Sequence, residues 1–416
     1  MGSLALSLES RKALLDELQS VYDEHRFLDA YSLSADYWTD STPIDDLSAE
    51  ELIFVGRLAS RVGGMRLSRH LYREAYKREP RLPVVRYFAR HITGPRDLLL
   101  DQLREFEKNP DLGGDDPELR ASWQAAHAYM FAILRDFSRA HDLLKNAHEL
   151  SPKSAWVFSQ EADVFGMADQ WRDSLRTAEL GCQIDPRSPW SVLSLATALL
   201  NLGEIDEAVT RLSQAAVDSQ YFHLVQTACW YHCALAETLE GDRRRRILDA
   251  ASALAERIQS MAPLVDREFK AGLARTWLDL AELNDDHAGI ERWAQEACSP
   301  FHRKVLANLK VNPNGKRIRL SYRRTLQKHV ECVPTSISSA LSATGVNVSV
   351  EELARDVTFG GTHEWAAADW LRGKGFHVRF FWATAESIAR LIEAGIGFTV
   401  SWDDDESGHT VAIVGA

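Results

Sequence analysis

The stretch AWVFSQEADVFGMADQWRDSLRTAELGCQIDP, residues 155–186, decides the fold of this chain. Its apolar residues recur three or four positions apart in two segments, which is the spacing that places them on one face of a helix. Pro186 follows the second segment, and a proline stops a helix because it lacks the N–H and clashes with the preceding turn. The stretch therefore predicts two helices joined by a short turn.

The same layout begins at residues 49, 121 and 189, so it is an internal repeat, with a period of 34 residues from the second copy onward. Small residues recur at its eighth, twentieth and twenty-seventh positions, and a proline stands at the thirty-second position of the first three copies. Two antiparallel helices approach closely only where their side chains are small. The small residues are Gly56, Ala128, Ala162 and Ala196; Ser68, Ala140, Ser174 and Ala208; and Ala75, Ala147, Gly181 and Ala215.

This pattern resembles the tetratricopeptide repeat. Two helices, Ala5–His25 and Leu28–Tyr37, are expected before it, and the stretches 83–120 and 221–300 read as degenerate helix pairs. A mostly α fold is therefore expected, in which residues 1–302 form an α-solenoid whose units each bury an apolar face on the next. The resemblance implies a peptide or protein partner that binds in the groove of the solenoid.

The chain changes character after residue 300, where helix-breaking residues such as Pro300 and Pro313 gather. Residues 303–320 are expected to be a linker, with a strand-like run at Lys316–Tyr322. An α+β domain is expected over residues 321–416. Its expected helices are Pro334–Thr344, Val350–Asp356, Glu364–Arg372 and Ala385–Ala394, and its expected strands are Phe376–Trp382, Gly397–Trp402 and His409–Gly415.

Cys332 is the candidate nucleophile of this C-terminal domain. A thiol attacks a carbonyl only as the thiolate, and a helix N-terminus or a nearby imidazolium favours that form. Cys332 stands two residues before Pro334, a residue type typical of the first helical turn, so we expect it at a helix N-terminus. His409 is the candidate base, and the Gln327 side chain with the backbone N–H of Cys332 is the candidate pair of oxyanion donors.

At these residues the sequence resembles the papain-like cysteine peptidases of the C39 type. The resemblance covers roughly residues 321–416: Gln327 before Cys332, the CVPTS helix start, WL before GF at 375–376, the strand IGF at 396–398, and GH at 408–409. It implies a papain-like fold in which Cys332 is the nucleophile, His409 the general base and Gln327 part of the oxyanion hole. Val333 stands where many members have glycine. The family's third residue, an aspartate or asparagine, would fall after Ala416, so the domain is expected to be incomplete at its C-terminus.

Three functions follow from these residues. The first is a cysteine peptidase that cleaves a peptide or protein through an acyl-enzyme, with the solenoid recruiting the substrate. The second is a non-enzymatic interaction scaffold with a degenerate peptidase-like domain. The third is an acyl- or amide-transferase, in which an amine replaces water as the acceptor. His329 and His363 are alternative candidates for the base.

Composition narrows the class of protein. The formal charge of −12 argues against a nucleic-acid binder and against adhesion to anionic membranes, because both need a concentrated positive surface. No window approaches the length of a membrane span and no signal peptide is recognised, so a cytoplasmic protein is expected. No cofactor is implied, and Cys229 and Cys233, which flank His232, favour packing over a metal site. The odd set of cysteines suits a reducing compartment: Cys182, Cys229, Cys233, Cys298 and Cys332.

Overall fold

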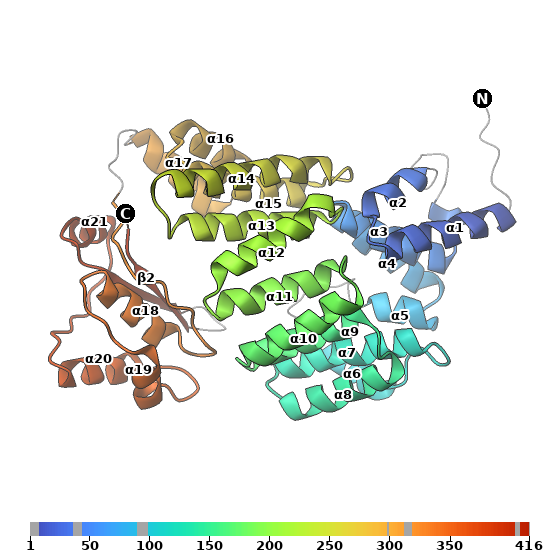
Figure 1. Cartoon of the computed structure of the whole chain (residues 1–416), viewed down its shortest axis with the longest axis horizontal. Coiled ribbons are helices and arrows are strands. Elements are labelled where there is room, and N and C mark those ends of the chain that lie inside the picture. The colour runs from blue at the N-terminus through green and yellow to red at the C-terminus, as the bar shows by residue number, and fades with distance from the viewer. Residues whose placement is uncertain are drawn as a thin grey trace. The chain divides into compact units, whose positions relative to one another are not determined.

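The computed structural model describes residues 8–35, 44–89, 99–297, 299–311, 318–403 and 408–415. The chain divides into two compact units, Met1–Val311 and Asn312–Ala416, and each is described by itself (Figure 1). The described part of the first unit is built from helices, and the described part of the second combines helices with one two-stranded sheet. A mostly α chain is therefore confirmed.

The four predicted repeats are four helical hairpins. Each first helix is followed after a short turn by a second helix that packs against it. The proline predicted to stop the second helix lies just outside it, as Pro186 does after α10. The helices are α3 (Ala49–Arg61) and α4 (Met65–Arg78), α7 (Pro117–Ile133) and α8 (Phe137–Leu150), α9 (Ala155–Met167) and α10 (Trp171–Ile184), and α11 (Pro189–Asn201) and α12 (Ile205–Asp218).

Small side chains sit where the helices cross. Ala128, Ala162 and Ala196, at the eighth position of three repeats, have no exposed surface. At Gly56, the same position of the first repeat, a β-carbon would lie 2.6 Å from Cε1 of Tyr72 on the partner helix. The small residues that revealed the repeat in the sequence therefore mark the points where the helices approach each other most closely.

The degenerate stretches are also helical, and the first unit extends beyond the range expected for the solenoid. The last helix, α17, runs through residues that were expected to be linker and ends at the boundary of the unit. The other helices are α5 (Pro83–Ala89), α6 (Leu99–Lys108), α13 (Phe222–Ala236), α14 (Gly241–Ser260), α15 (Arg267–Leu283), α16 (His287–Ala297) and α17 (Pro300–Val311).

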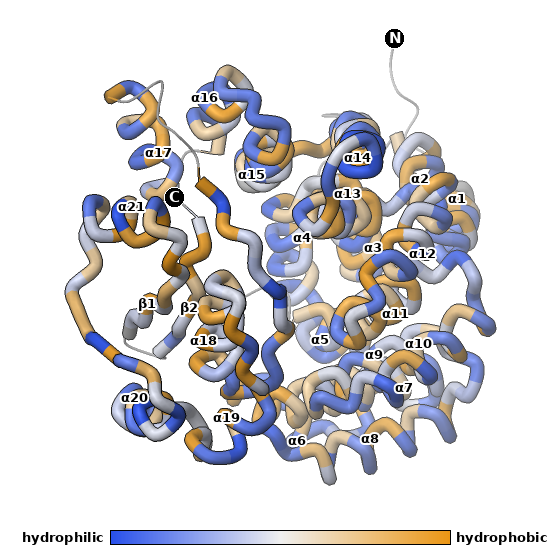
Figure 2. Tube along the Cα trace, turned by 60° about the vertical axis from the view of Figure 1, so that its left-hand side comes forward, coloured by the Kyte–Doolittle hydropathy of each residue, from blue (hydrophilic) through white to orange (hydrophobic). Residues whose placement is uncertain are grey.

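Two helices precede the first repeat, as expected. They are α1 (Leu8–Asp23) and α2 (Phe27–Leu33), and a short 3-10 helix, η2 (Ile44–Asp46), follows. The end of the expected helix Leu28–Tyr37 lies partly outside the described residues. Apolar and polar residues alternate along the helices in the hydropathy view (Figure 2). The core formed by α1–α5 includes Leu18, Phe27, Leu52 and Leu58, none of which has exposed surface.

The described part of the second unit packs four helices and a hairpin. The central helix α18 (Cys332–Ser342) contacts both strands, β1 (Phe398–Asp403) and β2 (Gly408–Ile413). The strands are antiparallel, with Val400 opposite Val411. Val333, Ile337 and Leu353 belong to the core of the unit. The remaining helices are α19 (Val350–Val357), α20 (Glu364–Gly373) and α21 (Ala385–Glu393).

Two expected strands differ from the structure. The expectation of a strand at Phe376–Trp382 is wrong, because this segment pairs with no described strand, and Trp382 is 96% exposed. The run expected at Lys316–Tyr322 makes a single β-bridge, between Arg319 and Gly415, and its first two residues lie outside the described ranges. A strand needs a partner, and local sequence pattern does not supply one. The described residues thus show a small α+β unit, and a papain-like fold remains a prediction.

Candidate functional site

The first helices of successive hairpins share a row of polar and aromatic residues at the ninth position of the repeat. Their neighbours in the helix are mostly buried, whereas these four side chains are half-buried or, in the third helix, exposed. Successive first helices pack against each other from α7 to α13, so the four positions follow one another across the unit. The position-nine row consists of Tyr129 on α7, Asp163 on α9, Thr197 on α11 and Tyr231 on α13.

Polar contacts link parts of this row. The Ser194 hydroxyl of α11 donates a hydrogen bond of 2.8 Å to Oδ1 of Asp163. The hydroxyls of Thr197 and Tyr231 lie 3.5 Å apart. Burial raises the pKa of Tyr129, and the carboxylate of Asp163 raises it further. Neighbouring first helices therefore present connected polar groups on one strip of the surface.

Asp163 is the electrostatically unusual member of the row. Burial raises the pKa of its carboxyl to about 6, and the hydrogen bond from Ser194 opposes this shift only in part. No lysine or arginine among the described residues forms an ion pair with it. A partly buried carboxyl without a cationic partner is costly to keep ionised, and such groups gather at functional sites.

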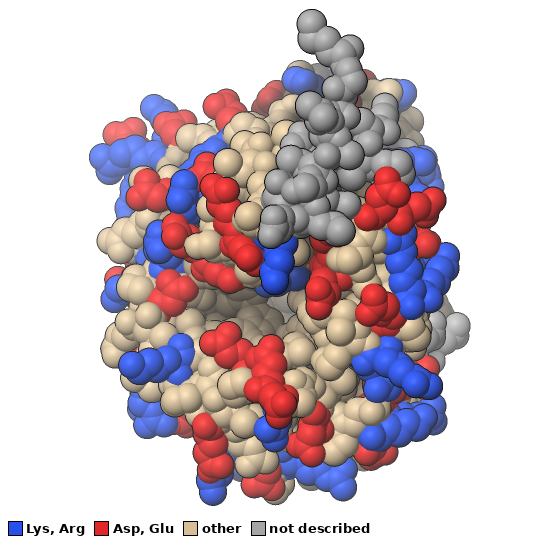
Figure 3. Space-filling model, turned by 90° about the vertical axis from the view of Figure 1, so that its right-hand side faces the viewer, with Lys and Arg blue, Asp and Glu red and all other residues tan. Residues whose placement is uncertain are grey.

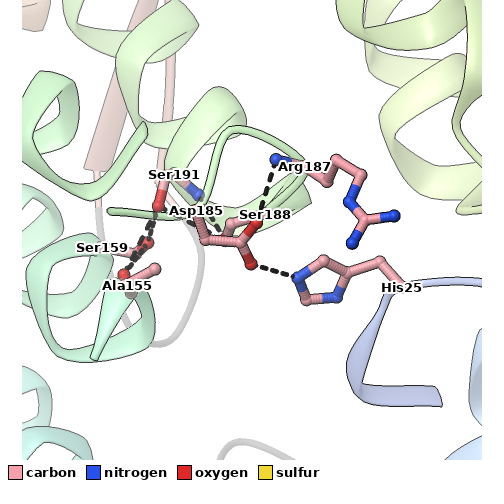
Figure 4. Close-up of polar contacts among 7 residues, drawn as sticks. All are labelled: His25, Ala155, Ser159, Asp185, Arg187, Ser188 and Ser191. Carbon is pink, nitrogen blue, oxygen red and sulfur yellow. Dashed lines mark hydrogen bonds and ion pairs between the residues drawn. The ribbon is translucent and has the colours of Figure 1, made fainter. Parts of the chain in front are cut away.

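A second feature of the first unit is that its N-terminal layer, the helices α1–α4, contacts the turns between later hairpins. His25 lies 2.7 Å from Oδ2 of Asp185, in the turn before α11 (Figure 4). The backbone N–H groups of Leu28 and Asp29 both donate to the side-chain oxygen of Gln220, in the turn before α13. Leu264, in the turn before α15, donates its N–H to the carbonyl of Val62 at 3.1 Å. Three successive junctions are thus held by one layer.

The turn before α11 is itself well organised. Ser188 caps the helix by accepting the N–H of Ser191, whose hydroxyl in turn lies 3.1 Å from that of Ser159 on α9 (Figure 4). Asp185 accepts the N–H of Arg187 with its other oxygen. The hydrogen bond from Arg187 holds the Asp185 carboxylate in the orientation in which its other oxygen contacts His25.

Arg61 joins the layer to the repeats through aromatic rings. Its guanidinium lies over the rings of Trp190, at 4.8 Å from the centroid, and Tyr221, at 5.3 Å. It also donates to the hydroxyls of Tyr22, at 3.2 Å, and Tyr221, at 3.3 Å. The rings of Trp190 and Tyr221 are stacked. Trp190 is half-buried within this contact, which packs the N-terminal end of α11 against the layer.

In the second unit, Cys332 is the first residue of α18 and is half-buried. The helix begins two residues earlier than the sequence suggested, with Cys332 itself in the first turn. The first-turn N–H groups of a helix are unpaired and point toward its N-terminus, where they favour negative charge. Cys332 therefore lies at the positive end of the α18 dipole.

His409 and Gln327 occupy different surroundings. His409 is the second residue of β2, and its ring packs edge-on to that of Trp402, with centroids 5.3 Å apart. Gln327 is exposed in the irregular segment before α18. No hydrogen bond joins the side chains of these two residues to each other or to Cys332 within the described part of the unit.

One hydrogen bond joins the helix that carries Cys332 to the strand that carries His409. The hydroxyl of Ser336, one helical turn after Cys332, donates a hydrogen bond of 3.0 Å to the carbonyl of Thr410, the residue after His409. The start of α18 is thus fixed to the start of β2. The catalytic roles of Cys332, His409 and Gln327 stay predictions. His329 lies exposed close to Gln327, and His363 precedes α20.

The other described thiols are enclosed. Cys229 has no exposed surface, its S–H donates to the carbonyl of Ala251 at 3.3 Å, and both the neighbouring Cys233 thiol and burial raise its pKa. Burial raises the pKa of Cys182 to about 11. Cys298 lies outside the described residues. Cys182 and Cys229 are therefore poor nucleophiles at neutral pH.

The position-nine row and the N-terminal layer are absent from the sequence predictions. The row had a signal: in the 34-residue register, a polar or aromatic residue recurs at a position surrounded by small and apolar ones. No signal in the sequence indicates the contacts of the N-terminal layer, because residues such as His25 and Asp185 lie far apart in the sequence.

Two further properties concern the surface. Acidic and basic side chains are interspersed over the face drawn in Figure 3, and acidic groups rim a hollow near its centre. Among the described helices, none has the length and apolar character needed to cross a membrane.

Comparison with known proteins adds likenesses of fold only. No family model and no curated protein matches the chain. A tetratricopeptide-repeat protein from Parabacteroides merdae matches with 14% identity, covering 64% of this chain and 98% of its own, at a TM-score of 0.37. Yeast Tom70 matches with 13% identity over 70% of this chain and 61% of its own, at a TM-score of 0.42. A TPR protein from Thermus thermophilus matches with 16% identity over 40% of this chain and 90% of its own, at a TM-score of 0.34.

These TM-scores are low, so the assignment rests on the packing of the chain's own hairpins. Small residues at the helix crossings, prolines after the second helices and the contacts between successive first helices all describe one repeating unit. The first unit is accordingly a tetratricopeptide-like helical solenoid.

Proposed function

We propose that the protein is an interaction scaffold that binds a peptide segment of a partner along the first helices of its solenoid. The observation that carries this proposal is the position-nine row. Its side chains are solvent-accessible, whereas their neighbours in the same helices are mostly buried: Tyr129, Asp163, Thr197 and Tyr231. A solvent-accessible strip of polar and aromatic groups on a rigid support offers hydrogen bonds and ring faces to an extended chain.

A matched pair of threonine variants tests this function. Thr197 on α11 and Thr210 on α12 are both exposed, but only Thr197 belongs to the row. The full chain is used to select binders from a random peptide library displayed on phage. The wild-type chain and Thr210→Arg should enrich the same peptides, whereas Thr197→Arg should bind them at least about tenfold more weakly, because a long cation occupies the strip. Failure to enrich any peptide, or equal loss in both variants, refutes the scaffold function.

A second function is a papain-like cysteine peptidase in the unit Asn312–Ala416. It is supported by the hydrogen bond between Ser336 and Thr410, which fixes the turn holding Cys332 next to the strand that carries His409. In this proposal His409 takes the proton of the Cys332 thiol. The thiolate attacks the substrate carbonyl, and the Cys332 N–H and the Gln327 amide stabilise the oxyanion. His409 then protonates the leaving amine, and water releases the acyl group.

Labelling with iodoacetamide tests the activated thiol. Cys332 should react faster than Cys182 and Cys229 at neutral pH, and His409→Ala should slow its reaction. Cys332→Ala should remove the fast label, whereas the control Cys182→Ala should keep it. Equal and slow labelling of Cys332 and Cys182 would exclude the peptidase. Product analysis with an added amine distinguishes hydrolysis from acyl transfer, because both share the acyl-enzyme.

A further inference from the structure

The carboxyl of Asp163 forms no ion pair with a described residue, and a single hydroxyl, that of Ser194, donates a hydrogen bond to it. We infer that Asp163 forms a subsite for the basic side chain, arginine or lysine, of a peptide bound along the position-nine row. This inference rests on the proposed scaffold function and adds the chemistry of the partner: the peptide carries a cation where it crosses α9.

The shape of the subsite follows from its three contributors. The Ser194 hydroxyl engages one carboxylate oxygen of Asp163, at 2.8 Å, and holds the group in place. The second oxygen accepts no hydrogen bond from the described residues. Tyr129 on the preceding first helix interacts electrostatically with the carboxylate. A cation at the end of a long aliphatic chain can contact the open oxygen while its stem or guanidinium plane lies against a tyrosine ring.

The composition of the surrounding helices favours a basic partner over an acidic one. The helices α9, α11 and α13 contain no lysine and no arginine. The acidic residues on them are Glu161 and Asp163, and Glu161 lies 3.0 Å from His148 of α8. Asp163 is therefore the acidic group of this strip that has no basic partner. A partly buried carboxylate without a partner favours a ligand that neutralises it.

The row also sets a spacing. Packed helices have axes about 8–10 Å apart, and an extended chain advances about 3.3 Å per residue. A peptide crossing the first helices would therefore place every third side chain on successive members of the row. A basic residue at Asp163 would stand three positions from the peptide residue that meets Thr197, whose hydroxyl lies 3.5 Å from that of Tyr231.

The titratable groups around Asp163 determine how binding depends on pH. Tyr129 faces it from α7, and α11 supplies no titratable side chain. The histidines of α8 contact other residues of α9: His141 packs on Phe165 and His148 on Glu161. The charged residues of α10 include Asp173 and Arg176, which pair with each other. Over the range where Asp163 titrates, its own carboxyl is the group of the subsite that changes charge.

Three chains are compared in the peptide selection: wild type, Asp163→Asn, and the control Glu161→Gln, which removes the same charge from the same helix. Asparagine keeps an oxygen that accepts from Ser194, so the local hydrogen bond survives. The wild type and Glu161→Gln should enrich arginine and lysine at one position of the selected peptides. Asp163→Asn should still enrich peptides but lose this preference, and it should bind the wild-type peptides about 10- to 100-fold more weakly.

A second readout uses one selected peptide and its citrulline analogue, a neutral isostere of arginine. Binding of the arginine peptide to the wild type should weaken about tenfold as the pH falls from about 7.5 to about 5, since Asp163 becomes protonated. Binding to Asp163→Asn, and of the citrulline peptide to the wild type, should change little. Selected peptides without basic enrichment would overturn the subsite but leave the scaffold function intact. A selection that yields no binders would overturn both.

Discussion

Arg61 lies over the indole ring of Trp190 with its guanidinium 4.8 Å from the ring centroid, although the two residues belong to different hairpins of the solenoid. It also donates hydrogen bonds to Tyr22 of the N-terminal layer and to Tyr221 in the turn before α13, so Arg61 links the layer to the repeats. Arg61→Ala should lower the free energy of unfolding by about 2 kcal/mol, because it removes the cation–π contact and two hydrogen bonds to tyrosine hydroxyls. Urea unfolding measures the change. The control Arg176→Ala, on an exposed i,i+3 pair, should stay within about 0.5 kcal/mol of the wild type.

Asp163→Asn should stabilise the fold at neutral pH. The pKa of the carboxyl is raised from 3.8 to about 6 in the folded protein, so folding favours the protonated form. The wild type is therefore destabilised progressively as the pH rises from about 4 to about 6, and the penalty is complete above the folded pKa. The variant should gain roughly 1–3 kcal/mol at pH 7 and almost nothing at pH 4. Thermal unfolding at both pH values measures this. An equal gain at pH 4 would contradict the electrostatic origin.

Two glycine-to-alanine substitutions in helices should have opposite signs. At Gly56 the new β-carbon would meet the ring of Tyr72 at 2.6 Å, so Gly56→Ala should cost about 1–3 kcal/mol despite its better helix propensity. At Gly272 on α15 nothing lies within 4 Å, so Gly272→Ala should stabilise by up to about 1 kcal/mol. Denaturant midpoints of the two variants give the comparison. Stabilisation by both would mean that the first hairpin is packed less closely than described.

Ser336→Ala should loosen the start of α18 from β2. Its hydroxyl is buried and donates to the carbonyl of Thr410, so its removal should cost about 1–2 kcal/mol in the second unit. Hydrogen exchange of the amides in β2 should accelerate, while those of α9 and α11 in the first unit should not change. Unchanged exchange in β2 would show that this bond does not hold the strand.

The sequence predicted the repeats well because their signal is local and recurs. A small residue at Ala162 or Ala196 is required wherever two helices cross closely, so the same residue types return at one period. Helix bounds in the second unit were also near those observed, as for Val350–Val357, where Ser349 caps the N-terminus. Local chemistry suffices in both cases.

What the sequence could not predict depends on contacts between distant segments. The run Phe376–Trp382 has the residue types of a strand, yet a strand forms only where another lies beside it. The pairing of His25 with Asp185 follows from the position of a whole layer of helices. Asp163 was overlooked for a related reason: its charge matters only because Ser194 and Tyr129 from other helices enclose it.

The contacts of the N-terminal layer with three successive turns change how the solenoid should unfold. In an open array each repeat interacts with its neighbours alone, so ends can fray independently and stability adds up unit by unit. Here residues in or next to α2 and α3 contact the turns before α11, α13 and α15. Opening any one of these hairpins breaks contacts with the same layer, which couples hairpins that are not consecutive in the chain. The first unit should therefore unfold in a single cooperative transition, and its repeats should not unfold one by one.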